Sequence, residues 1–246
     1  MKIQLGSIGN KVWSVSKQKV TAFWKENKKF LLICAFVVTP IKSVLADWNW
    51  VPTGSMNPTI MEGDLVYVDK AAYDLRVPLT MKRIAKWADP ERGDIVVFFS
   101  PQDGVRIVKR VIGVPGDELE IVNHVVYLNG GKLSYEVLPT KDSASFKPDL
   151  KGEVLFAEEN LPNHSHEIML TPRLTQNTKL ANLSKTTLPE GKYFIIGDNR
   201  DNSLDSRTYG FVDRDLIVGK VSHVIASFNT FNYCIPRCER FFSKLK

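Results

Sequence analysis

The run VRIVKRVIGVPGDELEIVNHVVYLNGG at residues 105–131 carries the strongest structural signal in this chain. The runs Val105–Val114 and Glu118–Leu128 are rich in Val and Ile and are bounded by turn residues, which is typical of β-strands. The triplet PGD at 115–117 separates the two runs, and NGG at 129–131 ends the second. Both triplets favour tight turns, so this stretch predicts consecutive antiparallel strands.

Shorter runs of the same character extend outward on both sides and are Leu65–Asp69, Asp94–Phe99, Tyr193–Ile196 and Leu216–Ile225. One short internal helix is expected, at Met81–Trp87. No long amphipathic helix alternates with the strand patterns, which argues against a doubly wound parallel sheet. The expected fold is therefore mainly β, built on an antiparallel sheet.

A change in composition divides the chain. Residues 118–191 are looser and richer in Lys, Asn, Ser, Thr and Pro than their flanks. We interpret them as an inserted variable β subdomain within a main β domain formed by 47–117 and 192–230. A basic C-terminal tail, 231–246, follows.

The N-terminal segment predicts a membrane anchor. Residues 1–29 contain seven lysines and a single acid, Glu26. The apolar stretch 30–46 follows, interrupted by Lys42, and its roughly 17 residues are at the short end of a transmembrane helix. Because basic residues flank membrane spans on the cytoplasmic side, 1–29 should lie in the cytoplasm and 47–246 outside it. Cleavage as a signal peptide after Ala46 remains an alternative.

The net charge of +6 is thus explained by topology, and no motif for nucleic acid accompanies it. Cys234 and Cys238 form a lone C-x3-C, whose oxidation to a disulfide is left open. A metal site would need two further ligands. His164 and His166 alternate in a polar stretch that we interpret as a solvated loop. We therefore expect neither a metal nor an organic cofactor.

Two blocks place reactive side chains in suitable settings. In PTGSMNPT, residues 52–59, Pro and Gly bend the backbone and would present Ser55 on a turn, as a nucleophile requires. In the strand pattern at 106–113, Lys109 shares a face with Ile107 and Val111. Burial there would lower the pKa of Lys109 and leave it neutral. Taken singly, each is more often an ordinary turn serine or a solvated strand lysine.

A third block, GDNRDNSLDSR at residues 197–207, is dense in hydrogen-bonding side chains. Asp205 and Arg207 can form an ion pair, and Ser203 can orient a neighbouring amine. A calcium loop is an alternative, because carboxylate and amide oxygens recur here. The spacing does not match an EF-hand, however, and a closing bidentate Glu is missing.

Together with Gly93–Phe98, these blocks occur in the order that resembles the conserved boxes of bacterial type I signal peptidases, the membrane-anchored Ser/Lys leader peptidases. The resemblance covers most of 42–117 and 192–225. Residues 118–191 correspond only in position to the variable second domain of that family. Four ordered boxes are far more specific than any one of them.

The resemblance implies a role for each matching residue. Ser55 would be the nucleophile and Lys109 the general base, with the Ser55 N–H and the Thr53 hydroxyl in the oxyanion hole. The remaining matches are Ser203 orienting the lysine, Val51 and Val108 lining pockets for small side chains, and Asp205 with Arg207 as a structural ion pair.

The resemblance also implies the setting. The substrates would be the signal peptides of exported preproteins, and the enzyme would be a single-pass protein of the bacterial inner membrane with a periplasmic catalytic domain. The basic tail and the C-x3-C depart from the family pattern and leave a dedicated substrate open, such as a pilin or a conjugation protein.

Two different functions would fit parts of the pattern. One is a self-cleaving Ser/Lys repressor, which the membrane segment and the lack of a DNA-binding helix-turn-helix disfavour. The second is an inactive membrane-tethered peptide-binding module, which the presence of both Ser55 and Lys109 disfavours.

Overall fold

The computed structural model describes residues 26–30, 32–34, 44–78, 80–139, 146, 154–171 and 178–245. The predicted cytoplasmic segment 1–29 and the predicted anchor 30–46 lie largely outside these residues. Within the described residues, no helix combines the length and apolar character needed to cross a membrane.

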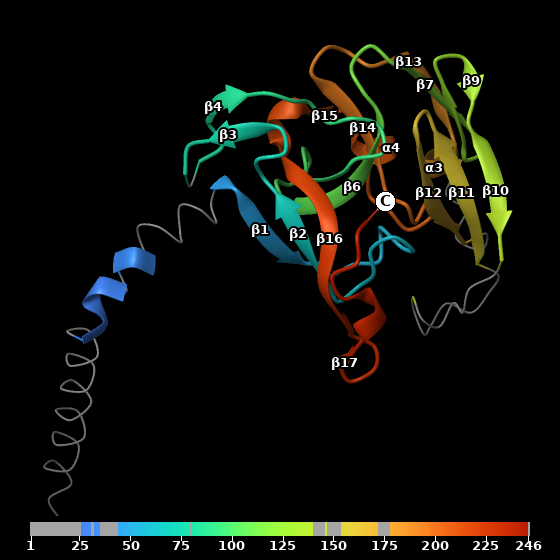
Figure 1. Ribbon diagram of the computed structural model, residues 1–246. Coiled ribbons are helices and arrows are strands. Elements are labelled where there is room, and N and C mark those ends of the chain that lie inside the picture. The colour runs from blue at the N-terminus through green and yellow to red at the C-terminus, as the bar shows by residue number, and fades with distance from the viewer. Residues whose placement is uncertain are drawn as a thin grey trace, which may run out of the picture.

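The described residues form one large antiparallel sheet with strand order β1-β2-β16-β5-β6-β14-β15, and β17 pairs with β16 (Figure 1). The long strand β16 crosses the centre of this sheet and lies between β2 and β5. The strands are β1 (Ala46–Trp50), β2 (Asp64–Asp69), β5 (Ile95–Phe99), β6 (Arg106–Gly113), β14 (Lys192–Ile196), β15 (Val212–Asp213), β16 (Ile217–Asn229) and β17 (Ile235–Pro236).

Between β6 and β14 the chain builds two smaller antiparallel sheets, ordered β13-β7-β8-β9 and β10-β11-β12. Figure 1 shows β10, β11 and β12 beside the main sheet, on the side away from β1. Their strands are β7 (Glu118–Val122), β8 (Val125–Leu128), β9 (Gly131–Lys132), β10 (Ser134–Leu138), β11 (Leu155–Leu161), β12 (His164–Leu170) and β13 (Leu183–Thr187). A separate pair consists of β3 (Asp74–Arg76) and β4 (Arg83–Lys86).

The described helices of the β region are short: α3 (Thr178–Ala181), α4 (Ser206–Tyr209), η3 (Arg214–Leu216) and η4 (Cys238–Arg240). The mainly β, antiparallel architecture expected from the sequence is therefore confirmed. Apolar side chains from β2, β5 and β16 pack into one cluster with the segment that follows β1.

Three local predictions were wrong. Residues 83–86 form β4, not a helix, because they pair with β3 and Arg83 makes a 2.8 Å ion pair with Asp74. The run 118–128 is two strands, since Asn123 and His124 turn the chain at φ values of 48° and 66°. His164 and His166 lie on β12 rather than in a solvated loop, and His166 is only 3% exposed.

Candidate active site

The segment between β1 and β2 carries Ser55 on a turn closed at its base. Val51 N donates to Asp64 O at 2.9 Å, and Gly63 N donates back to Val51 O at 2.9 Å. Inside the loop, Asn57 N donates to the Gly54 carbonyl at 3.1 Å. A Cβ on Gly54 would lie 2.6 Å from Asn57 Nδ2 and 3.2 Å from Glu62 Oε1, so any larger residue here would have to displace these side chains.

Lys109 meets this turn from β6, where it pairs with Val96 of β5. Its side chain is buried, with 3% of the residue exposed, and its Nζ forms a short hydrogen bond with Ser55 Oγ. The two residues are 54 positions apart in sequence, so the fold alone brings them together.

Burial lowers the pKa of Lys109 to about 8, since removing the ammonium from water disfavours its charged form. Asp205 and Asp198 oppose this shift by attracting the ammonium, and Arg207 reinforces it. About one Lys109 side chain in eleven is therefore neutral at pH 7 and able to accept a proton.

Asp205 and Arg207 make a bidentate ion pair beside the lysine, with Arg207 Nη2 and Nε at 2.8 and 2.9 Å from the carboxylate. Asp205 is fully buried and also accepts a hydrogen bond from Gly197 N at 3.1 Å. It caps the N-terminus of α4 by accepting from Arg207 N. The pair thus fixes the course of the 197–207 loop past Lys109.

Ser203 is buried in this loop, but its hydroxyl makes no hydrogen bond of normal geometry with any described residue. It lies close enough to the Asp205 carboxylate to help lower the pKa of that group. A hydrogen bond from Ser203 to Lys109, which the sequence predicts, is not formed in the structure, and the orienting role stays a prediction.

The predicted pocket residues share one apolar cluster. Val51 is buried with Met56 and Ile60, and Val108 packs against the same cluster. Thr53, two residues before Ser55, is exposed. The structure therefore places the Ser55 hydroxyl against the buried Lys109 amine, and the apolar cluster with Val51 and Val108 includes Met56, the residue after Ser55.

The sequence predicted no role for Asn199, which holds the turn that carries Ser55. Its Nδ2 donates to the Gly54 carbonyl at 3.0 Å, and its backbone N donates to the Ser55 carbonyl at 3.2 Å. Asn199 lies in the same polar block as Ser203, but nothing in the sequence distinguishes it from the other amides there.

A buried charge network also escaped prediction. Asp198 pairs with Arg110, the residue after Lys109, at 2.8 Å. Glu159 of β11, which is fully buried, makes a bidentate pair with Arg200, one hydrogen bond being 2.8 Å long. His166 Nε2 lies 3.3 Å from the same Glu159 carboxylate. These pairs join the 197–207 loop to both the main sheet and a smaller one.

The polar block does not leave its carboxylates open for calcium. Asp198 and Asp205 are paired with arginines, and Asp201 accepts a hydrogen bond from Thr171 N at 2.6 Å. No group of three or more metal-binding side chains occurs among the described residues. Cys234 and Cys238 are both exposed and unpaired with each other in the structure.

Together, the β fold and a serine hydroxyl that is hydrogen-bonded to a buried lysine indicate a hydrolase of the serine peptidase class. The family model for signal peptidase, peptidase S26, matches residues 24–226, and the chain belongs to this family.

Individual signal peptidases are also similar to this chain. The chain is 36% identical over 209 residues to a signal peptidase I of Rickettsia akari, covering 78% of this chain and 76% of that one. It is 32% identical over 235 residues to the Pseudomonas fluorescens signal peptidase I, covering 87% and 80%. A Buchnera aphidicola signal peptidase I is 31% identical over 226 residues, covering 78% and 72%. A crystal structure of an Enterococcus faecalis signal peptidase I is 34% identical and covers 54% of this chain and 96% of that chain, with a TM-score of 0.33.

Proposed function

We propose that this serine peptidase removes N-terminal signal peptides from exported preproteins, with Ser55 as nucleophile and Lys109 as general base. The observation that carries the proposal is the hydrogen bond between Ser55 Oγ and the buried Lys109 Nζ. Membership of the signal peptidase family supports the choice of substrate.

The reaction follows from this pair. Neutral Lys109 takes the Ser55 proton while Oγ attacks the scissile carbonyl, which gives a tetrahedral oxyanion. The Ser55 N–H and the Thr53 hydroxyl stabilise that oxyanion. Collapse of the intermediate breaks the peptide bond, and the Lys109 ammonium protonates the departing amine. Lys109 then takes a proton from water as that water attacks the acyl-enzyme carbonyl. Collapse of this second intermediate breaks the ester bond and releases the signal peptide acid, which ionises, and the Lys109 ammonium returns its proton to Ser55 Oγ.

Specificity for small residues follows from the apolar cluster. Val51 is 5% exposed and Val108 is half-buried, and both pack in this cluster. In the proposed complex they would form a shallow surface for the substrate. A larger side chain before the scissile bond would clash with this surface, whereas alanine would be accepted.

The proposed setting is the bacterial inner membrane. Residues 30–46 would anchor the chain, 1–29 would remain in the cytoplasm, and the catalytic domain, 47–117 with 192–230, would lie in the periplasm. The support is the excess of lysine before the apolar stretch. A reporter domain that works only outside the cytoplasm should be active when it is fused after residue 47. A mature N-terminus at Asp47 would show that the apolar segment is a cleaved leader and not a retained anchor.

The mechanism is tested with Ser55→Ala and Lys109→Ala in the full-length chain, using a preprotein substrate. Both variants should keep the circular-dichroism spectrum of the unchanged protein and lose processing, because the mechanism needs both groups. Lys220→Ala removes the ion pair between Lys220 of β16 and Asp94 but leaves Ser55 and Lys109 unchanged. It is the matched control and should cleave normally. Near-normal turnover by either active-site variant would refute the assignment.

A further inference from the structure

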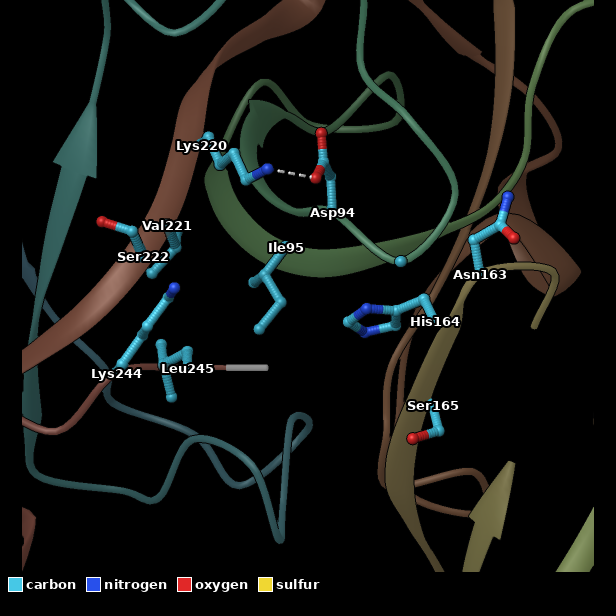
Figure 2. Close-up of a pocket in the computed structure, with 11 residues that line it drawn as sticks. Asp94, Ile95, Asn163, His164, Ser165, Lys220, Val221, Ser222, Lys244 and Leu245 are labelled. Carbon is cyan, nitrogen blue, oxygen red and sulfur yellow. Dashed lines mark ion pairs between the residues drawn. The ribbon is translucent and has the colours of Figure 1, made fainter. Parts of the chain in front are cut away.

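The basic tail, which the sequence left without a role, folds back along the main sheet. We call residues 231–245 the C-terminal strap. Val224 N donates to Ser243 O and Leu245 N donates to Ser222 O, both at 2.9 Å, so the strap ends alongside β16. Figure 2 shows Lys244 and Leu245 next to Ile95 and Val221, where they line a pocket of about 410 Å³.

Arg240 in the strap reaches into the nucleophile-bearing segment. Its Nη2 donates to Asp64 Oδ2 at 2.6 Å and to the Thr59 carbonyl at 3.0 Å. Asp64 is fully buried and also accepts a hydrogen bond from Met61 N at 2.8 Å. One guanidinium therefore holds two points of the 51–64 segment, downstream of Ser55.

A second contact holds Thr59 through its side chain. Its hydroxyl donates to Asp198 Oδ2 at 2.5 Å, and Asp198 is paired with Arg110 of β6. Arg110 directly follows Lys109 in the chain. A continuous series of polar contacts thus runs from Arg240 through Thr59 and Asp198 to the strand that carries the proposed base.

The link from Thr59 back to Ser55 is short and rigid. Ile60 N donates to the Met56 carbonyl at 2.9 Å, which closes one turn of backbone directly after Ser55. Met56 and Ile60 are fully buried in the cluster against which Leu245 of the strap packs. A shift of Thr59 would therefore be transmitted to Ser55 rather than absorbed in a loose loop.

We propose that Arg240 is a positioning residue, which fixes the segment carrying Ser55 at hydrogen-bonding distance from Lys109. The inference rests on the proposed Ser55–Lys109 mechanism. Arg240 does not touch the reacting atoms, so its loss should change the rate of the chemical step and leave the proposed substrate binding at Val51 and Val108 nearly intact.

The test compares full-length Arg240→Ala and Arg240→Lys on a preprotein substrate. Arg240→Ala should lower kcat by about tenfold or more with little change in KM, because a displacement of ~1 Å can cost ~100-fold in rate. Arg240→Lys should recover only part of this, since an ammonium lacks the planar fork that engages a carboxylate and a carbonyl together. Millimolar methylguanidinium should raise kcat of Arg240→Ala.

Lys244→Ala is the matched control. Lys244 lies on the same strap, and its side chain makes no ion pair with any described residue, so kcat should stay unchanged and methylguanidinium should have no effect. The acid limb of the pH–rate profile should stay in place in Arg240→Ala, because the burial of Lys109 is unaltered. A purely stabilising role would instead lower the melting temperature and leave kcat of the folded protein unchanged.

The outcomes separate the positioning role from the mechanism. Full kcat in folded Arg240→Ala would overturn the positioning role even if Ser55→Ala is inactive. Activity in Ser55→Ala would overturn the mechanism itself. If Arg240→Ala does not fold, Arg240→Lys decides: a reduced kcat at unchanged KM supports the proposal, and a normal kcat overturns it.

Discussion

A methyl group added at Gly197 should disturb the active site directly. A Cβ built there would lie 2.2 Å from Ser203 Oγ and 2.4 Å from the Ser55 carbonyl oxygen. Ordinary contact begins at 3.4 Å, so Gly197→Ala would displace these atoms by about 1.2 and 1.0 Å if they alone moved. Ser203 is buried and the Ser55 carbonyl accepts a hydrogen bond from Asn199 N, so neither group can move away freely.

Because a misplacement of ~1 Å can cost ~100-fold in rate, we expect Gly197→Ala to lower kcat by roughly that factor. The assay is steady-state cleavage of a preprotein, with circular dichroism to verify folding. Gly131→Ala is the matched control, since the nearest atom to its Cβ would be the Leu128 carbonyl oxygen at 3.5 Å. A folded Gly197→Ala enzyme with near-normal kcat would refute the close packing described here.

Three further predictions concern other parts of the site. Thr53→Val should lower kcat by ~100-fold or more through loss of an oxyanion donor, and Thr53→Ser should restore it; equal rates in both would exclude that role. Lys109→Met should abolish activity yet increase the free energy of unfolding at pH 7 by on the order of 3 kcal/mol, because the pKa is about 8 in the folded state and higher when unfolded. The gain should vanish above pH ~10.4, and urea denaturation at several pH values measures it. Glu159→Ala should destabilise the protein by roughly 3–5 kcal/mol by leaving the Arg200 charge buried and unpaired, and a change below ~1 kcal/mol in the same assay would contradict this.

The strands were predictable from sequence where a run rich in β-branched and aromatic residues was bounded by turn residues. The patterns at 94–99, 105–114 and 193–196 correspond closely to β5, β6 and β14. The 83–86 segment was not predictable, because its conformation depends on pairing with β3 and on the contact between Arg83 and Asp74. Local propensity does not contain the information on this strand pairing.

The active site was likewise predictable from the sequence only in part. Ser55 and Lys109 were identified by the order of four sequence blocks, and the structure brings them into contact. The roles of Asn199 and Arg240 could not be predicted, since each depends on which backbone carbonyls the fold brings near. His166 was wrongly predicted to be solvated because its neighbours in the sequence are polar. In the structure it is buried, with its Nε2 3.3 Å from the Glu159 carboxylate.

The proposed mechanism depends on a neutral, buried Lys109 as the base. With a pKa of about 8, roughly one molecule in eleven is neutral at pH 7, whereas an ordinary lysine of pKa ~10.4 would be neutral in about one in 2,500. Activity should therefore be present above the folded pKa and be lost as the pH falls through it.

The decisive experiment is to measure kcat/KM for preprotein cleavage as a function of pH, with a substrate that lacks titrating groups near the scissile bond. A buried base predicts a rise of about tenfold per pH unit that levels off above pH 8. A rate that instead continues to climb without a break to pH ~10.4 would show that the base titrates as an exposed lysine, and the buried-base mechanism would be wrong.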